Sequence, residues 1–306
     1  MGRNHRKRWR NKSNQDNELI RLLDELSDRT AIQPQERLRL ENDGGDVTCR
    51  VVDLITPFGK GQRVLLPSPP KAGKTMILQK ISHAVDENYP DVRQLALLVD
   101  ERVEEVTDFN RNIPSEVRAS SIDQHPKSHV KTAERCFQHA IDSMFEGRDV
   151  LVLLDSLTRL ARAYNKVHNH SGRTLSGGLS AGALDRPRQL FGSARNLEGG
   201  GSLTVVASTL IDTGSRMDEV IFQEFKGTGN AELMLDRDLA EHRLWPAVDI
   251  EASGTRQEAN LLTDLEYRKI TDLRRRVAGL DKLDALKWLR SRIESTESNE
   301  ELLENV

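Results

Sequence analysis

The residues with the clearest chemistry form a short loop between an apolar run and a helical pattern. The loop runs from Ser68 to Thr75 and ends in Gly-Lys-Thr, after the apolar residues 64–66 and before a helical pattern that begins at Met76. A strand, such a loop and a helix start make a P-loop, whose amides face nucleotide phosphates. The usual first glycine is Ser68 here, and the alternative is a turn that merely contains these residues.

The P-loop predicts a site for ATP and Mg²⁺. Lys74 is expected to contact the β- and γ-phosphates, and the Thr75 hydroxyl to bind Mg²⁺. The expected nucleotide contacts are Pro70, Lys71, Ala72, Gly73, Lys74, Thr75 and Met76.

Polar residues follow two further apolar runs. Glu101 and Arg102 come after residues 95–99, and Asp155 comes after residues 150–154. In a parallel sheet the ligand lies beyond the carboxyl ends of the strands. We therefore expect Glu101 to orient the attacking water, Arg102 to sense the γ-phosphate and Asp155 to complete the Mg²⁺ site. The alternative for either acid is a carboxylate that caps the following helix.

Short apolar runs alternate with helical patterns between Cys49 and Gly254. The expected strands are Val64–Leu66, Leu95–Val99, Val150–Leu154, Leu203–Ala207 and Glu232–Leu235, and helices are expected at residues 130–145 and 181–196. Near-continuous apolar strands separated by helices predict an α/β fold with a mostly parallel sheet covered on both faces.

Two glycine-containing loops each carry one cation. Arg173 and Gly177 lie in the loop of residues 171–178, and Arg216 lies in the loop of residues 211–218. Such loops could contact a phosphodiester backbone without reading bases. The alternative is a pair of ordinary surface loops.

Composition limits the class of protein. The chain has 306 residues, is 37% hydrophobic and carries a net charge of -3, so nucleic acid would have to bind a local patch. The two cysteines have no metal-binding spacing, which suits a reducing cytoplasm. An apolar stretch long enough to span a membrane is missing. We expect a cytoplasmic protein without a membrane partner.

The pattern divides the chain into three parts. Residues 1–45 form a basic extension, partly disordered, with a short helix predicted at residues 17–26. Its first residues could touch phosphates through cations and Trp9, or could only aid solubility. Residues 46–295 form the ATPase domain with C-terminal helices, and residues 296–306 form a frayed acidic tail.

Several longer strings resemble the ATPase domain of the bacterial transcription termination factor Rho family, a family of RecA-like hexameric RNA translocases. The likeness runs from about Arg37 to about Ser295. The matching strings are Pro69–Thr75, Asp100–Arg102, Leu154–Asn165, Ile211–Ser215, Glu224–Asn230 and Ser253–Arg256.

This resemblance implies roles for individual residues. Lys71, Lys74 and Thr75 match phosphate and Mg²⁺ contacts, Glu101 the water-activating glutamate, and Asp155 the Walker B acid. Arg256 matches an arginine finger that completes the neighbouring subunit's site, and Trp245 an aromatic that packs on adenine. The loops with Arg173, Gly177 and Arg216 match two RNA loops, in which lysine is common at the two arginine positions.

The resemblance also leaves the activity open. Family members carry an N-terminal RNA-binding barrel, whereas only about fifty residues precede Val51 and they show no run of alternating strands. The main hypothesis is an RNA-dependent ATPase ring that translocates on RNA and terminates transcription, with RNA and RNA polymerase as partners. The alternatives are a regulator that joins rings of a full-length Rho, and a RecA-like ATPase that acts on DNA.

Overall fold

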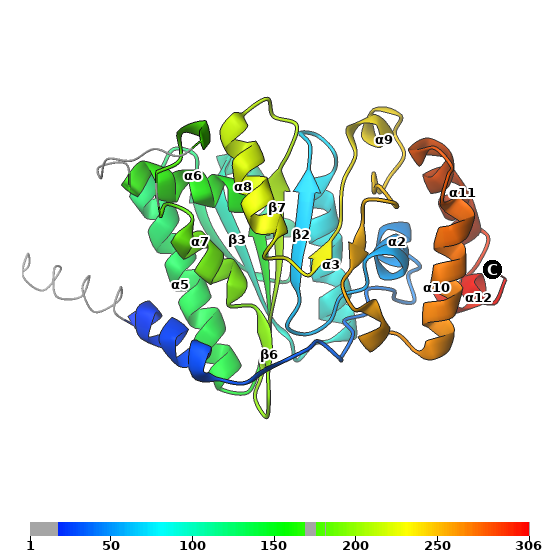
Figure 1. Cartoon of the computed structure of the whole chain (residues 1–306), viewed down its shortest axis with the longest axis horizontal. Helices are drawn as coiled ribbons and strands as arrows, with labels where there is room; N and C mark the ends of the chain where they lie inside the picture. The colour runs from blue at the N-terminus through cyan, green and yellow to red at the C-terminus, as the bar shows by residue number, and fades with distance from the viewer. Residues whose placement is uncertain (1–17, 169–175, 181, 306) are drawn as a thin grey trace, which may run out of the picture.

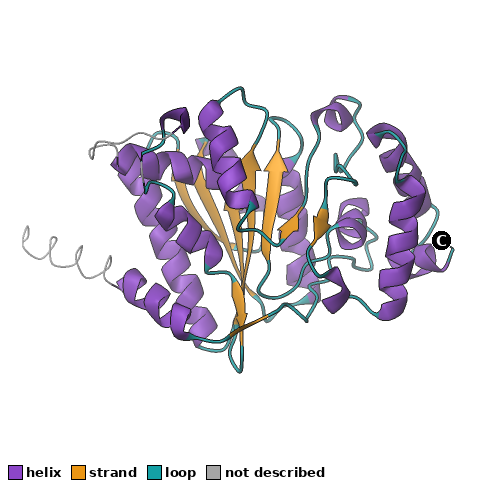
Figure 2. Ribbon diagram, viewed as in Figure 1, coloured by secondary structure: helices purple, strands orange, loops and turns teal. Residues whose placement is uncertain are grey.

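The computed structural model describes residues 18–168, 176–180 and 182–305, and these build one large sheet with helices on both faces (Figure 2). The sheet has the strand order β4-β3-β5-β7-β2-β8-β9, and β6 and β1 extend it from β7. Neighbours from β4 to β8 are parallel, whereas β9, β6 and β1 are added antiparallel. The strands are β1 (Ala31–Ile32), β2 (Arg63–Ser68), β3 (Arg93–Glu101), β4 (Glu116–Ser121), β5 (Asp149–Asp155), β6 (Arg195–Leu197), β7 (Ser202–Leu210), β8 (Ala231–Glu232) and β9 (Gly254–Thr255).

The helices lie on both faces of this sheet and beyond one of its edges (Figure 1). One face carries residues 18–28, α5 (Pro126–Phe145), α6 (Leu157–His168), α7 (Asp185–Gly192) and α8 (Arg216–Lys226). The remaining helices share a second hydrophobic core. They are α2 (Val47–Ile55), α3 (Lys74–Asn88), α4 (Val103–Asn112), α9 (Arg237–Glu241), α10 (Asp264–Val277), α11 (Lys282–Glu294) and α12 (Asn299–Glu304).

Alternate residues of the central strands enter two separate cores. Leu65 of β2 lies in the core that also contains residues of α5, α6 and α8, whereas Val64 and Leu66 lie in the core that contains residues of α3. Because side chains alternate across a strand, a sheet covered on both faces needs apolar residues at successive positions. This confirms the predicted α/β class and explains why the strands read as unbroken apolar runs.

Four of the five expected strands are confirmed with small shifts of their ends. The fifth is shorter than expected, because β8 ends at Glu232 and Leu235 makes only an isolated bridge to Val248. The helix expected over residues 181–196 spans only α7, and its last residues turn into β6. The edge strand β4 was not predicted, because it reads Glu-Val-Arg-Ala-Ser-Ser and pairs on one side only.

The first residues that the structure describes belong to the folded body. Helical residues 18–28 bury Leu19, Leu22 and Leu26 against the core that contains α5, and Leu38 and Leu40 are buried in the other core. The boundary expected at residue 46 is therefore too late. The basic tail with Trp9 lies outside the described residues.

The acidic end of the chain is not a frayed tail. Leu302 and Leu303 of α12 are buried in the same core as α2. The buried Arg50 guanidinium donates to the Asn299 side-chain oxygen at 3.1 Å and to the Thr296 carbonyl at 2.6 Å. The two leucines form an apolar face of the acidic helix, and Arg50 fixes the start of the helix. Neither feature can be predicted from the net charge of the segment.

Both cysteines, Cys49 and Cys136, are unpaired and buried. Among the described residues, no helix combines the length and apolar character that crossing a bilayer requires. The same residues contain no cluster of three or more histidine, cysteine or acidic side chains arranged to hold a metal ion.

Candidate functional site

The P-loop lies where β2 passes into α3. Gly73 precedes the helix with φ 86°, a conformation that favours glycine. A Cβ atom there would lie 2.7 Å from Cζ3 of Trp245. Gly73 offers no capping side chain, so the first amides of α3 stay free of a side-chain cap and face the loop. Both the turn and the close approach of Trp245 therefore require this glycine.

The structure brings three of the expected site residues together at the carboxyl edge of the sheet. Nζ of Lys74 lies 3.1 Å from Oε1 of Glu101 and also contacts Oδ1 of Asp155. Parallel pairing of β3 with β5 sets Leu98 opposite Asp155, which leaves Glu101 just beyond it. The Ser208 hydroxyl, from β7, donates to Asp155 Oδ1 at 2.8 Å and fixes that carboxylate.

Burial and charge set the protonation of this cluster. Burial, then the nearby Asp155 carboxylate, raises the pKa of Glu101 to about 8, against the opposing effect of Lys74. Burial disfavours the charge on Lys74, but Asp155 and Glu101 outweigh it and raise the pKa of Lys74. Lys74 therefore stays a cation, and Glu101 holds its proton to a higher pH than an ordinary carboxyl group, a shift of the kind found at functional sites.

Arg159 joins the cluster, although sequence reasoning gave it no role. Its Nη1 atom lies 3.2 Å from Oε2 of Glu101 and donates to the carbonyl oxygen of Asp100. Oε2 of Glu101 is buried and accepts no hydrogen bond within the described part of the chain. The position of Arg159 in the sequence could have indicated its role, because it falls on the first turn of the helix that follows Asp155.

A cavity of about 550 Å³ lies beside the P-loop on the Trp245 side. Trp245 lines it and also lies against Gly73, so one ring contacts both the cavity and the phosphate loop. The other lining residues are Pro70, Lys71, Arg237, Ala240, Glu241 and Arg243. This shape and position suit a nucleotide base next to its phosphates.

Two of the expected arginines lie apart from the cluster. Arg102 is the N-cap residue of α4; its side chain is 67% exposed, and its Nη1 atom lies 3.7 Å from Oε1 of Glu105. Arg256 is exposed, and its amide donates to the Asn230 carbonyl. Asn230 in turn bonds to Arg63, at the start of β2, about 17 Å along the strand from the P-loop end. The Arg256 backbone therefore lies at the far end of β2 from its own P-loop.

The two glycine-containing loops lie against each other. A Cβ at Gly177 would lie 3.1 Å from the backbone oxygen of Arg216, and Arg216 begins α8 with an exposed side chain. Gly177 has φ 75°, so both space and conformation favour glycine there. Arg173 lies outside the described residues.

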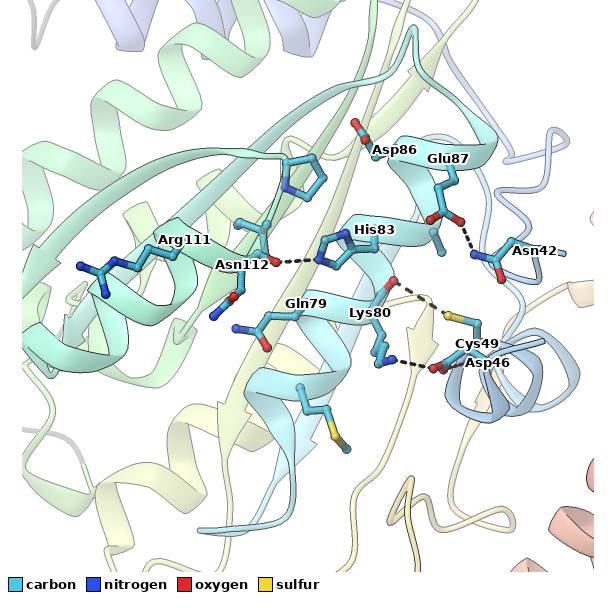
Figure 3. Close-up of a pocket in the computed structure, with 14 residues that line it drawn as sticks. Asn42, Asp46, Cys49, Gln79, Lys80, His83, Asp86, Glu87, Arg111 and Asn112 are labelled. Atoms are coloured by element: carbon cyan, nitrogen blue, oxygen red, sulfur yellow. Dashed lines mark hydrogen bonds and ion pairs between the residues drawn. The ribbon is translucent and has the colours of Figure 1, made fainter. Parts of the chain in front are cut away.

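A larger cavity, about 720 Å³, lies behind α3 and is separate from the charge cluster (Figure 3). Several of its polar side chains are paired with one another or with backbone. Lys80 contacts Asp46 at 2.7 Å, His83 contacts the Asn112 carbonyl, and Asn42 contacts Glu87. Because paired groups of both signs line it, we assign no ligand to this cavity.

Comparison with known proteins places this geometry in a class. Residues 48–255 match the model of the ATP synthase alpha/beta family, nucleotide-binding domain. An ATPase of a bacterial type III secretion system has a similar structure, with a TM-score of 0.74 over 90% of this chain and 85% of that one. The ATPase EscN of enteropathogenic E. coli gives a TM-score of 0.72 over 90% of this chain and 71% of that one. Both are 22% identical, which supports the fold alone. The chain therefore contains a P-loop ATPase domain of this class.

Closer relatives are named transcription termination factor Rho. The chain is 54% identical to the Micrococcus luteus protein over 89% of its own length and 39% of that protein. It is 50% identical to the Haemophilus influenzae protein over 90% and 66%, and 52% identical to the Streptosporangium roseum protein over 92% and 73%. This chain belongs to the transcription termination factor Rho family. It spans between about two fifths and three quarters of these relatives.

Proposed function

We propose that this chain is an RNA-dependent ATPase motor, which hydrolyses ATP to translocate on RNA and terminate transcription. The observation that carries the proposal is the contact of Lys74 with both Glu101 and Asp155 beside a P-loop. A lysine for phosphates and two acids with different surroundings are the parts that hydrolysis of ATP needs. Family membership supports the RNA-directed part of the proposal.

The residues present fit a nucleotide and Mg²⁺. Thr75 offers a hydroxyl and Asp155 a carboxylate, the hard oxygen donors that Mg²⁺ prefers. When bound, Mg²⁺ would neutralise charge on the phosphates. Lys74 would hold the phosphates, and Glu101 would orient a water and accept its proton at a carboxylate oxygen. The buried Oε2 of Glu101, which accepts no hydrogen bond among the described residues, supports this role.

The position of Arg256 supports a shared site in an oligomeric ring. This exposed side chain starts at the end of β2 opposite the P-loop, so it is poorly placed to reach its own nucleotide. An arginine supplied by a neighbouring subunit can stabilise the transferring phosphoryl group. We therefore propose a homo-oligomer, a hexameric ring by family resemblance, in which Arg256 completes the next subunit's site.

The paired loops support an RNA channel. Arg216, beside Gly177, and Arg173 would contact phosphates of single-stranded RNA, since such contacts ignore base identity. RNA polymerase is the further partner that termination would require.

ATP turnover of the purified full chain, measured with and without single-stranded RNA, tests the proposal. We expect RNA to raise turnover and single-stranded DNA of the same length to raise it less. Stimulation by DNA alone would indicate a DNA-directed ATPase. No turnover with either polymer, together with assembly into rings of a full-length Rho, would replace the motor by a regulator.

A further inference from the structure

Helix α6 carries three polar side chains that each contact a different functional part of the molecule. Arg159, Arg162 and Asn165 follow one another at intervals of three residues, so they lie along one side of the helix. Arg159 contacts Glu101 at 3.2 Å. The other two reach the loops that we propose for RNA.

Arg162 holds the start of α8. Its Nε atom donates to Oδ1 of Asp218 at 2.8 Å, and its Nη2 atom contacts Oδ2. The Asp218 side chain is 1% exposed and also accepts from the Thr213 hydroxyl at 2.7 Å. This two-point ion pair, close to Arg216 in sequence, therefore ties the second loop to α6.

Asn165 holds the first loop. Its Oδ1 atom accepts from the Ser180 amide at 2.7 Å, and its Nδ2 atom donates to the Gly178 carbonyl at 3.1 Å. A side-chain amide bonded to two backbone groups fixes a segment of chain in position and in direction. Asn165 is itself buried, which shields these bonds from water.

The helix is itself firmly seated between these contacts. Leu157, Leu160 and Ala161 are fully buried in the core with α5, and the Thr158 hydroxyl accepts from the Leu210 amide at the end of β7. A packed helix moves as a unit, because close packing resists local deformation. Displacing either loop would therefore act on the whole of α6, including Arg159.

We infer that α6 couples the RNA loops to the catalytic glutamate, with Arg162 and Asn165 as positioning residues. RNA held by the loops acts on α6 through Asp218 and the Gly178 carbonyl, and α6 acts on Glu101 through Arg159. The inference rests on the proposed function, and it identifies residues that touch neither nucleotide nor polymer. Coupling between two sites is typically worth about 5–150-fold.

The test compares Arg162→Ala and Asn165→Ala with the full-length wild-type chain at saturating single-stranded RNA of mixed sequence. We expect basal turnover and ATP affinity to be unchanged, and the ratio of RNA-stimulated to basal turnover to fall by about 5–150-fold. Saturating RNA separates lost coupling from weaker RNA binding. Arg162→Lys, which keeps the charge but loses the two-point contact, should restore part of the ratio.

Arg188→Ala is the matched control, because Arg188 of α7 pairs with Glu224 at the other end of α8. It should keep normal stimulation. If Arg162→Ala does not fold, Asp218→Asn and Arg162→Lys replace it, and the ratio of RNA-stimulated to basal turnover is measured for these two variants.

If RNA stimulates the wild-type chain and the α6 variants equally, the coupling inference is overturned, whereas the proposed function is not. An equal fall of basal and stimulated turnover would also overturn it, in favour of a purely structural role. A wild-type chain that RNA does not stimulate would overturn the proposed function, and the coupling with it.

Discussion

Nζ of Lys74 lies 3.1 Å from Oε1 of Glu101, so the P-loop lysine and the proposed water-orienting glutamate are in direct contact. Lys74 also contacts Asp155, and Arg159 lies on the other oxygen of Glu101. Two buried acids thus contact two cations at one edge of the sheet. Changing any one of these charges should affect the others, since little water screens them.

Replacing Lys74 removes the cation that we expect on the phosphates. Lys74→Ala should abolish ATP hydrolysis and weaken ATP binding, measured by turnover and by nucleotide titration. Lys287→Ala, at an exposed lysine of α11 that lies 3.9 Å from Asp284, is the control and should behave as wild type. Unchanged turnover in Lys74→Ala would remove the P-loop assignment.

The raised pKa of Glu101 predicts a pH-dependent stability. The folded pKa of about 8 lies above the ordinary 4.5, so the folded state binds the extra proton. The stabilisation is complete below pH 4.5 and is lost as pH rises through about 8. Glu101→Gln should lose this dependence, and should gain stability relative to wild type as pH rises over that range.

Denaturant unfolding of the nucleotide-free protein at several pH values measures this difference. Glu104→Gln, at an exposed position of α4, should follow the wild-type profile. Parallel profiles for Glu101→Gln and wild type would show that Glu101 has an ordinary pKa.

A shared active site predicts complementation between variants. Arg256→Ala and Glu101→Gln should each reduce turnover strongly, the first by about 10³–10⁵-fold if it acts as an arginine finger. Mixed rings should regain part of the activity, because some sites then combine an intact Glu101 with an intact Arg256. Co-assembled mixtures without any recovery would argue for a site within one subunit.

The RNA loops predict a selective loss. Arg216→Ala should lower RNA stimulation of turnover and RNA affinity, and should leave basal ATP binding intact. Lys226→Ala removes a cation from the opposite end of the same helix and serves as the control. Full stimulation in the Arg173→Ala, Arg216→Ala double variant would place RNA elsewhere.

The Arg50 contacts predict a stability effect far from the nucleotide. Arg50→Ala leaves the Thr296 carbonyl and the buried Asn299 side-chain oxygen, which accept from it at 2.6 and 3.1 Å, without this donor. Each buried group left unsatisfied costs about 1–3 kcal/mol, so unfolding free energy should fall by at least about 2 kcal/mol. Arg275→Ala, at an exposed ion pair with Asp272, should cost less than about 1 kcal/mol. Equal losses of unfolding free energy in Arg50→Ala and Arg275→Ala would show that the Arg50 contacts do not hold the start of α12.

The sequence by itself determined the features that depend on residues close together in the chain. Residues 64–66 and 150–154 had to be central strands, because unbroken apolar runs suit a sheet covered on both faces. Glycine at residue 73, before Lys74, predicted the phosphate loop for a local reason, since the turn needs a positive φ. The strand-end positions of Glu101 and Asp155 followed from the rule that parallel strands end at one edge.

Only the tertiary structure decided the contacts between distant segments. Trp245 packs on Gly73, Arg162 pairs with Asp218, and Arg50 holds Asn299. Nothing local favours these partners, because each pair is set by strand order and helix packing across sequence separations of 56 to 249. The same holds for the acidic residues of α12, whose helix is stable because two leucines meet a core built largely by earlier segments.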